Sequence, residues 1–124
     1  MGTANAKIAL VDLGGTQIRV AVSDAAGNFV IRIARPTPSI GGEATVSALR
    51  DAIGEAIAAS NCKVEAIAIV APGPLDPRRG LIVNAPNIPH WQNLPLSAIL
   101  EKIFSVPVLL GNDASLAALA EQKF

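Results

Sequence analysis

The sequence predicts an α/β domain in which helices cover the faces of a mixed sheet, with elements in the order βββαβαβα. Three observations predict this class. Apolar, strand-like runs near the N-terminus are joined by short turns, and two later apolar stripes have the three- and four-residue spacing of helices. A short apolar run follows each helical stripe, as expected for strands that are linked by crossover helices. The length of 124 residues is that of one domain.

Three strands are expected at residues 7–13, 17–23 and 29–34. The first is apolar on both faces, which is typical of a strand that is covered on both sides. The second alternates apolar with polar or small residues, and the third ends before Pro36. Short turns between these strands predict an antiparallel meander.

Two crossover units follow the meander. Helices are expected at 43–60 and 96–104, because apolar residues recur there at helical spacing: Val46, Leu49, Ile53 and Ile57 in the first, and Leu96, Ile99, Leu100, Ile103 and Phe104 in the second. Short strands are expected after them at 65–71 and 107–110. A last helix is expected at 113–123, with Asn112 or Asp113 available as its N-cap.

The stretch between residues 72 and 95 is rich in proline and predicts a long irregular loop, in which 80–83 is expected to form a short strand. A loop of this length in a compact domain is either functional or disordered. Its apolar residues and Trp91 argue against disorder. Trp91 is expected to anchor the loop by burying its ring, and His90 to be a loop residue.

Charge and cysteine content exclude several classes of function. Ten basic residues balance ten acidic ones, so the chain has no electrostatic footprint for nucleic acid or a membrane surface. The single Cys62 cannot form an internal disulfide, and a zinc site would lack its usual ligands. The N-terminus has no signal-peptide character and no apolar run approaches the length of a membrane span, so a cytoplasmic protein is expected.

The segment IALVDLGGTQIRV at residues 8–20 carries the first candidate site. Asp12 ends an apolar strand, and Gly14, Gly15 and Thr16 follow it directly. A carboxylate can hold Mg²⁺, directly or through water, and glycine backbone can approach phosphate oxygens and bind them through N–H groups. The segment is therefore interpreted either as a nucleotide-phosphate site or as an ordinary β-hairpin with a Gly-Gly turn.

Asp113 is the second candidate, because it lies where a strand passes into a helix N-terminus. The helix dipole favours a charged carboxylate there, and such a group can accept a proton from an alcohol. A simple capping role is the alternative. Because Asp12 also ends a strand, both carboxylates are expected at one edge of the sheet, where ligands gather in open α/β folds. Phosphoryl transfer needs a metal-holding group and a group that deprotonates the acceptor.

Four segments in this order carry a resemblance to a known family: VDLGGTQIR, AIVAPGPLDPRRG, NAPNIPHWQNLPL and GNDASLAALAE. Together they resemble the N-terminal domain of the ROK family, which contains sugar kinases and sugar-responsive repressors. The resemblance covers essentially the whole chain. It implies a ribonuclease-H-like domain of the actin and hexokinase type.

The resemblance also implies roles for individual residues. ATP phosphates and Mg²⁺ would be bound by the first motif, with Asp12 on the metal: Asp12, Gly14, Gly15, Thr16 and Gln17. The sugar would be bound by Gly73, Asn87, Asn112 and Asp113. Asp113 would also be the catalytic base for the sugar hydroxyl that receives the phosphate.

The function implied is that of the N-terminal half of an ATP-dependent hexose kinase, similar to glucokinases. Residues 1–124 are expected to form a single N-terminal domain that lacks the family's second domain, so the isolated chain is expected to be inactive. Its uncovered apolar surface is expected to cause self-association or homo-oligomer formation. The alternative is the sugar-binding effector domain of a ROK-type transcriptional regulator, without turnover.

Overall fold

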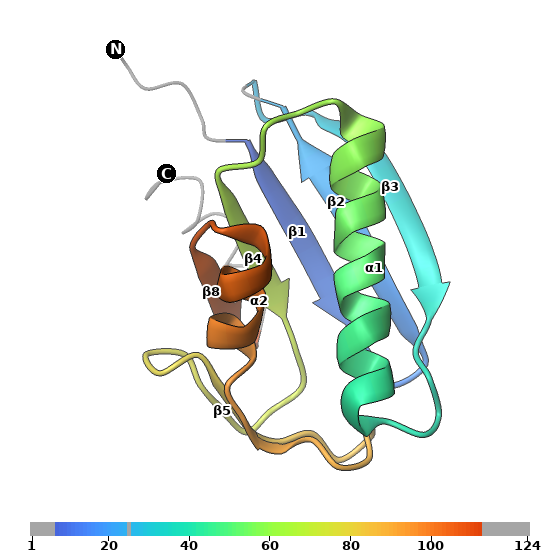
Figure 1. Ribbon diagram of the computed structural model, residues 1–124, viewed down its shortest axis with the longest axis vertical. Helices are drawn as coiled ribbons and strands as arrows, with labels where there is room; N and C mark the ends of the chain where they lie inside the picture. The colour runs from blue at the N-terminus through green and yellow to red at the C-terminus, as the bar shows by residue number, and fades with distance from the viewer. Residues whose placement is uncertain (1–6, 25, 113–124) are drawn as a thin grey trace.

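The computed structural model describes residues 7–24 and 26–112, which form a five-stranded sheet with two helices on one face (Figure 1). The elements in chain order are β1 (Ile8–Leu13), β2 (Gln17–Ser23), β3 (Phe29–Pro36), α1 (Gly42–Ser60), β4 (Ala66–Val70), β5 (Leu75–Asp76), β6 (Leu81–Asn84), β7 (Gln92–Leu94), α2 (Leu96–Phe104) and β8 (Val108–Gly111). The expected mixed sheet with crossover helices is confirmed. The helix expected at 113–123 lies outside the described residues.

The strand order of the main sheet is β3-β2-β1-β4-β8. Strands β1 to β3 form the expected antiparallel meander, while β4 runs parallel to β1 and β8 runs parallel to β4. The carboxyl ends of β1, β4 and β8 therefore meet at one edge of the sheet. The register places Asp12 beside Val70, and Val70 beside Gly111, at that edge.

The main core lies between the sheet and the two helices. Alternate residues of β1 and β2 point toward the helices and are at most 2% exposed, as period-two alternation requires: Val11, Leu13, Ile18, Val20 and Val22. Leu49 and Ile53 of α1 and Leu100 of α2 are fully buried against them. Burial of each such side chain contributes roughly 1.5–3 kcal/mol, so this interface supplies most of the hydrophobic stabilisation.

The second helical stripe is only partly buried. Leu96 and Leu100 of α2 are completely buried, as expected, but Ile103 is 44% exposed and Phe104 is half-buried. The reason is geometric, because α2 covers the sheet near its β8 edge and cannot turn five apolar side chains inward at once. None of the helices among residues 7–24 and 26–112 is long and apolar enough to cross a bilayer.

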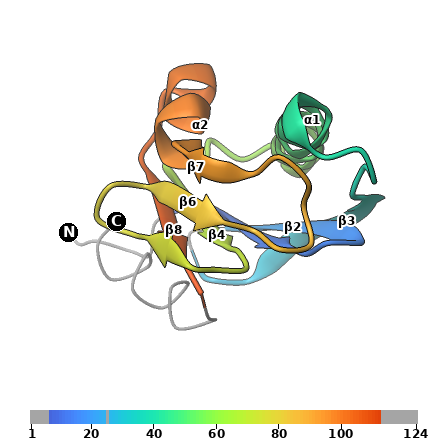
Figure 2. The same ribbon diagram turned by 90° about the horizontal axis from the view of Figure 1, so that it is seen from below.

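The stretch at 72–95 corrects the expected element order. In place of a loop with one short strand at 80–83, it contains a second, three-stranded antiparallel sheet in the order β5-β6-β7. Figure 2 shows this small sheet from the edge where β1 and β4 end. Its strands are two to four residues long, too short for alternation to be recognised between prolines.

Candidate functional site

The Asp12 segment forms a tight connection between β1 and β2, which we call the glycine turn (residues 12–17). Its first hydrogen bond runs from the Gly14 N–H to the Gln17 carbonyl at 2.9 Å. Asp12, Thr16 and Gln17 are exposed. The hairpin interpretation is thus confirmed, and the phosphate interpretation is compatible with it, because the turn presents its polar groups at the carboxyl edge of the sheet.

Two backbone donors of this turn have no partner among residues 7–24 and 26–112. The N–H groups of Gly15 and Thr16 form no hydrogen bond to any residue that the structure describes. Two adjacent unpaired N–H groups beside bare glycine backbone are what an anion-binding turn requires.

Thr37, just after β3, forms hydrogen bonds to the turn from a neighbouring strand end, a role that the sequence did not predict. Its hydroxyl donates to the Gly14 carbonyl at 2.8 Å, and its own N–H donates to the Thr16 carbonyl at 3.0 Å. Nothing in the sequence signals this role, because a threonine after Arg35 and Pro36 is an ordinary residue at the end of a strand.

The segment that carries Asn87 is held by its own backbone, and we call it the Asn87 loop (residues 85–91). Ala85 and Trp91 are joined by a hydrogen bond of 3.1 Å, and Ile88 bonds back to Ala85 at 3.0 Å. Trp91 is 1% exposed, and its Nε1 donates to the Gly42 carbonyl at 3.0 Å. The expected anchoring role of Trp91 is confirmed, and Asn87 is left exposed.

The glycine turn and the Asn87 loop are in direct contact. A Cβ atom placed on Gly15 would lie 2.7 Å from the Asn87 Cβ and 3.2 Å from the Asn87 carbonyl oxygen. Because real Cβ atoms do not approach so closely, only glycine fits at this position. The fold therefore brings together two segments that were predicted to serve phosphate and sugar.

A second close approach joins the other two segments. A Cβ atom on Gly73 would lie 2.7 Å from Asn112 Nδ2 and 3.2 Å from the backbone nitrogen of Leu75. Asn112 is exposed just after β8, and the Ala71 N–H donates to the Gly111 carbonyl at 2.9 Å. Asn112 thus lies beside Gly73 at the same edge as Asp12. Asp113, the predicted base, lies outside the described residues.

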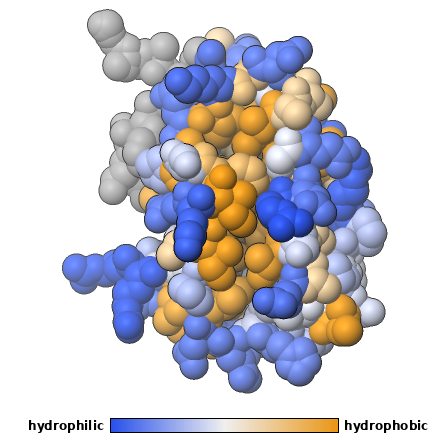
Figure 3. All heavy atoms as spheres, viewed as in Figure 1, coloured by the Kyte–Doolittle hydropathy of each residue, from blue (hydrophilic) through white to orange (hydrophobic). Residues whose placement is uncertain are grey.

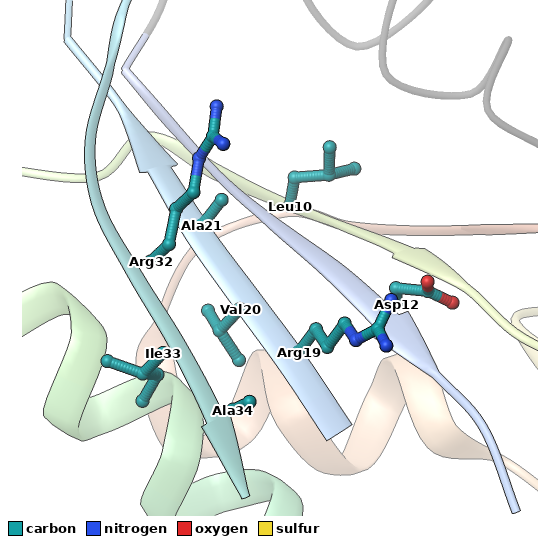
Figure 4. Close-up of a pocket in the computed structure, with 8 residues that line it drawn as sticks. All are labelled: Leu10, Asp12, Arg19, Val20, Ala21, Arg32, Ile33 and Ala34. Carbon is teal, nitrogen blue, oxygen red and sulfur yellow. The ribbon is translucent and has the colours of Figure 1, made fainter. Parts of the chain in front are cut away.

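Arg19 is a further charged neighbour of the glycine turn. It lies directly opposite Asp12 in the β1–β2 register, and Figure 4 shows its guanidinium directed toward the Asp12 side. Its Nε donates to the Gln17 side chain at 3.1 Å. Both Asp12 and Arg19 line a pocket of about 320 Å³ along β1–β3, to which Arg32 adds a second cation. Positive charge therefore adjoins the Asp12 carboxylate.

The donor set suits Mg²⁺ held by few protein ligands. Among residues 7–24 and 26–112 no group of three His, Cys, Asp or Glu side chains could hold a metal. Mg²⁺ commonly keeps several waters and is bound by one or two carboxylates together with substrate phosphates. The exposed Asp12 carboxylate beside free backbone donors fits that pattern.

Comparison with known proteins identifies the family. The sequence matches the ROK family over residues 8–124. It is 36% identical over 116 residues to a glucokinase from Streptomyces coelicolor, covering 92% of this chain and 35% of that protein. The chain thus spans about a third of the length of that relative.

Solved structures share the fold. A ROK hexokinase from Thermus thermophilus aligns with a TM-score of 0.80 and 43% identity, over 95% of this chain and 39% of that one. A ROK glucokinase from Streptomyces griseus in complex with glucose and AMPPNP aligns with a TM-score of 0.72 and 35% identity. The alignment covers 90% of this chain and 35% of that one. A ROK transcriptional regulator, described as a homologue of the E. coli MLC protein, aligns with a TM-score of 0.76 and 27% identity. The alignment covers 95% of this chain and 30% of that one.

The fold is therefore of the actin and hexokinase type, as the family resemblance implied. The chain belongs to the ROK family.

Proposed function

We propose that this chain is the N-terminal part of an ATP-dependent sugar kinase that phosphorylates a hexose. The observation that carries the proposal is the contact of Gly15 with Asn87, because it sets a phosphate-type turn against an amide side chain suited to sugar hydroxyls. The relatives described as glucokinase and hexokinase support the same reaction class.

The glycine turn is the proposed site for the ATP phosphates. The N–H groups of Gly15 and Thr16 would bind phosphate oxygens, with the Thr16 hydroxyl and the Gln17 amide as further donors. Asp12 would hold Mg²⁺, directly or through water. When bound, Mg²⁺ neutralises charge on the phosphate oxygens during transfer.

The sugar would lie along Gly73, Asn87 and Asn112. Each asparagine side chain offers two donors and one acceptor, which matches vicinal hydroxyls. Gly73 leaves its backbone open on the side where Asn112 lies. Asp113 would accept the proton of the attacking hydroxyl, and the glycine turn would hold the phosphate that this hydroxyl attacks.

These residues would form one wall of a cleft between two domains. All the described members of the proposed site are exposed or half-buried and lie at one edge of the sheet. We therefore propose that residues 1–124 alone do not catalyse transfer, and that a second domain completes the site. The share of each relative that the chain covers is consistent with this division.

The second candidate is a ROK regulator that binds sugar without turnover. The structural likeness to a ROK transcriptional regulator favours it. Sugar binding without phosphorylated product in the full-length protein would select this function over the kinase.

The kinase proposal is tested with Asp113→Asn in the full-length protein. Loss of a positioned base is expected to lower kcat by about 10²–10⁴-fold while sugar affinity stays largely intact. Asp51→Asn, an exposed change on α1 away from the proposed site, is the matched control and should retain full activity. Unchanged turnover in Asp113→Asn would contradict the assignment.

A further inference from the structure

We propose that Thr37 is a positioning residue that holds the glycine turn in its phosphate-binding conformation. The inference rests on the proposed kinase function and extends it to a residue that touches neither substrate. Thr37 is 9% exposed and lies outside every segment that the sequence analysis assigned to the site.

Thr37 binds the turn twice, and both bonds end on carbonyl oxygens. The hydroxyl donates to the Gly14 carbonyl at 2.8 Å, and the N–H donates to the Thr16 carbonyl at 3.0 Å. Because Gly14 and Thr16 are two residues apart, the two hydrogen bonds hold two separate peptide units of the turn.

Each bond also fixes the opposite end of a peptide unit. A trans peptide is planar, so its C=O and its N–H point in opposite directions. Because the Gly14 carbonyl points toward Thr37, the N–H of Gly15 in the same unit points away from it. The Gly15 N–H is one of the donors left free at the turn.

The hydroxyl matters because no other described residue forms a hydrogen bond with the Gly14 carbonyl. Gly14 and Gly15 have wide conformational freedom, so the Gly14–Gly15 peptide can rotate readily when it is not bonded. The remaining internal bond, from Gly14 N–H to the Gln17 carbonyl, closes the hairpin but does not bond the Gly14 carbonyl. Preorganised donors cost no reorganisation when phosphate charge develops.

The test uses Thr37→Val in the full-length protein, because valine keeps the shape and removes the hydroxyl. Loss of one hydrogen bond is expected to raise the KM for ATP about three- to tenfold, and to leave the KM for the sugar unchanged. Thr37→Ser, which restores the hydroxyl, should recover the ATP KM.

Thr45→Val is the matched control. Thr45 is a fully buried threonine in α1 whose hydroxyl has no hydrogen-bond partner among the described residues. The same change there should leave both KM values unaltered. An unchanged ATP KM in Thr37→Val, or an equal rise in both KM values, would overturn the inference.

A second readout separates this inference from the proposed function. Hydrogen exchange of the Gly14 amide, measured by NMR on ¹⁵N-labelled protein, should be several-fold faster in Thr37→Val than in the unsubstituted protein. If exchange is faster but the unsubstituted protein neither binds nor hydrolyses ATP, Thr37 holds the turn and the kinase function is wrong. If ATP is used but exchange and the ATP KM are unchanged, the kinase stands and the role of Thr37 is wrong.

Discussion

Gly15 of the glycine turn packs against Asn87, so closely that a Cβ atom on Gly15 would lie 2.7 Å from the Asn87 Cβ. The contact joins the connection between β1 and β2 to a loop near α2, far along the chain. It gives the two proposed substrate regions a common wall. A change at either residue should therefore affect both substrates.

The first prediction concerns Gly15→Ala. The added methyl would meet the Asn87 Cβ and the Asn87 backbone carbonyl, neither of which can move without shifting the loop. A displacement near 1 Å costs about 10²-fold in rate, so kcat/KM for both ATP and sugar should fall by about that factor. Steady-state kinetics of the full-length protein measure it.

Gly54→Ala is the control for that variant. Its added Cβ would lie 4.0 Å from a Phe104 ring carbon, which is ordinary contact. Alanine in a helix interior is favoured over glycine by about 0.8–1.0 kcal/mol, so Gly54→Ala should raise Tm and keep full activity. Normal kinetics in Gly15→Ala would show that the contact is irrelevant to the reaction.

The second prediction is a milder effect of Gly73→Ala. Its added methyl would meet Asn112 Nδ2, the end of a side chain that can rotate away, and would lie 3.2 Å from the Leu75 backbone nitrogen, which needs a shift of only a few tenths of an ångström. The sugar KM should rise by about tenfold with the ATP KM unchanged, since one hydrogen-bonding group is displaced. Asn112→Ala should have a similar effect, and the double variant should be little worse than either. Full additivity of the two changes would argue against a shared role.

The third prediction tests Asp12 as the metal-holding residue. Asp12→Asn should raise the Mg²⁺ concentration needed for half-maximal activity by at least about tenfold. Loss of a group that supports a bound metal typically lowers metal affinity by about that factor or more. Because Asp12 is exposed, its stability effect should stay within about 0.5 kcal/mol. Activity is titrated with Mg²⁺ at fixed ATP. An unaltered Mg²⁺ curve would remove Asp12 from the metal site.

The fourth prediction concerns the anchor of the Asn87 loop. Trp91→Phe removes the hydrogen bond to the Gly42 carbonyl but keeps an aromatic ring in the core. The free energy of unfolding should fall by about 0.5–1.5 kcal/mol, the net contribution of one hydrogen bond to a half-buried carbonyl. Trp91→Ala should cost about 3–5 kcal/mol through the added cavity. Urea unfolding followed by circular dichroism compares the two variants, and an unchanged free energy of unfolding in Trp91→Phe would mean that the hydrogen bond contributes nothing.

The fifth prediction is self-association of the isolated 124-residue chain. Apolar side chains gather in a groove between α1 and α2 (Figure 3), where a pocket of about 720 Å³ is lined in part by Val46, Leu94 and Ile99. Exposed patches of this kind commonly mediate association. Sedimentation velocity should show a concentration-dependent shift that Ile99→Glu reduces. A monomer at all concentrations would contradict the prediction.

The sequence was sufficient for the main sheet and its two helices. Strands β1 to β3 and helices α1 and α2 follow from periodicity, because their alternating or helical apolar faces are long enough to be recognised. The second sheet was not predictable in the same way. A strand such as β5, Leu75–Asp76, is too short to have a recognisable pattern of apolar residues, and it is identified only by its pairing with β6.

The sequence also identified the candidate residues, but it did not predict which of them are in contact. Residue types and the family resemblance selected Asp12, Gly15, Gly73, Asn87 and Asn112. Only the tertiary structure decided that Gly15 lies against Asn87 and Gly73 against Asn112. Such contacts depend on how a parallel sheet aligns the ends of strands that are distant in sequence, and no local pattern encodes that.

The contacts of Thr37 show most clearly what could not be predicted from the sequence. By itself the sequence determined a tight turn built on two glycines, which leave the backbone open. The direction of the Gly14 and Thr16 carbonyls in that turn depends on Thr37, just after β3, through two hydrogen bonds. Local residue types specify what a turn can bind, whereas its orientation depends on long-range partners that exist only once the sheet has formed.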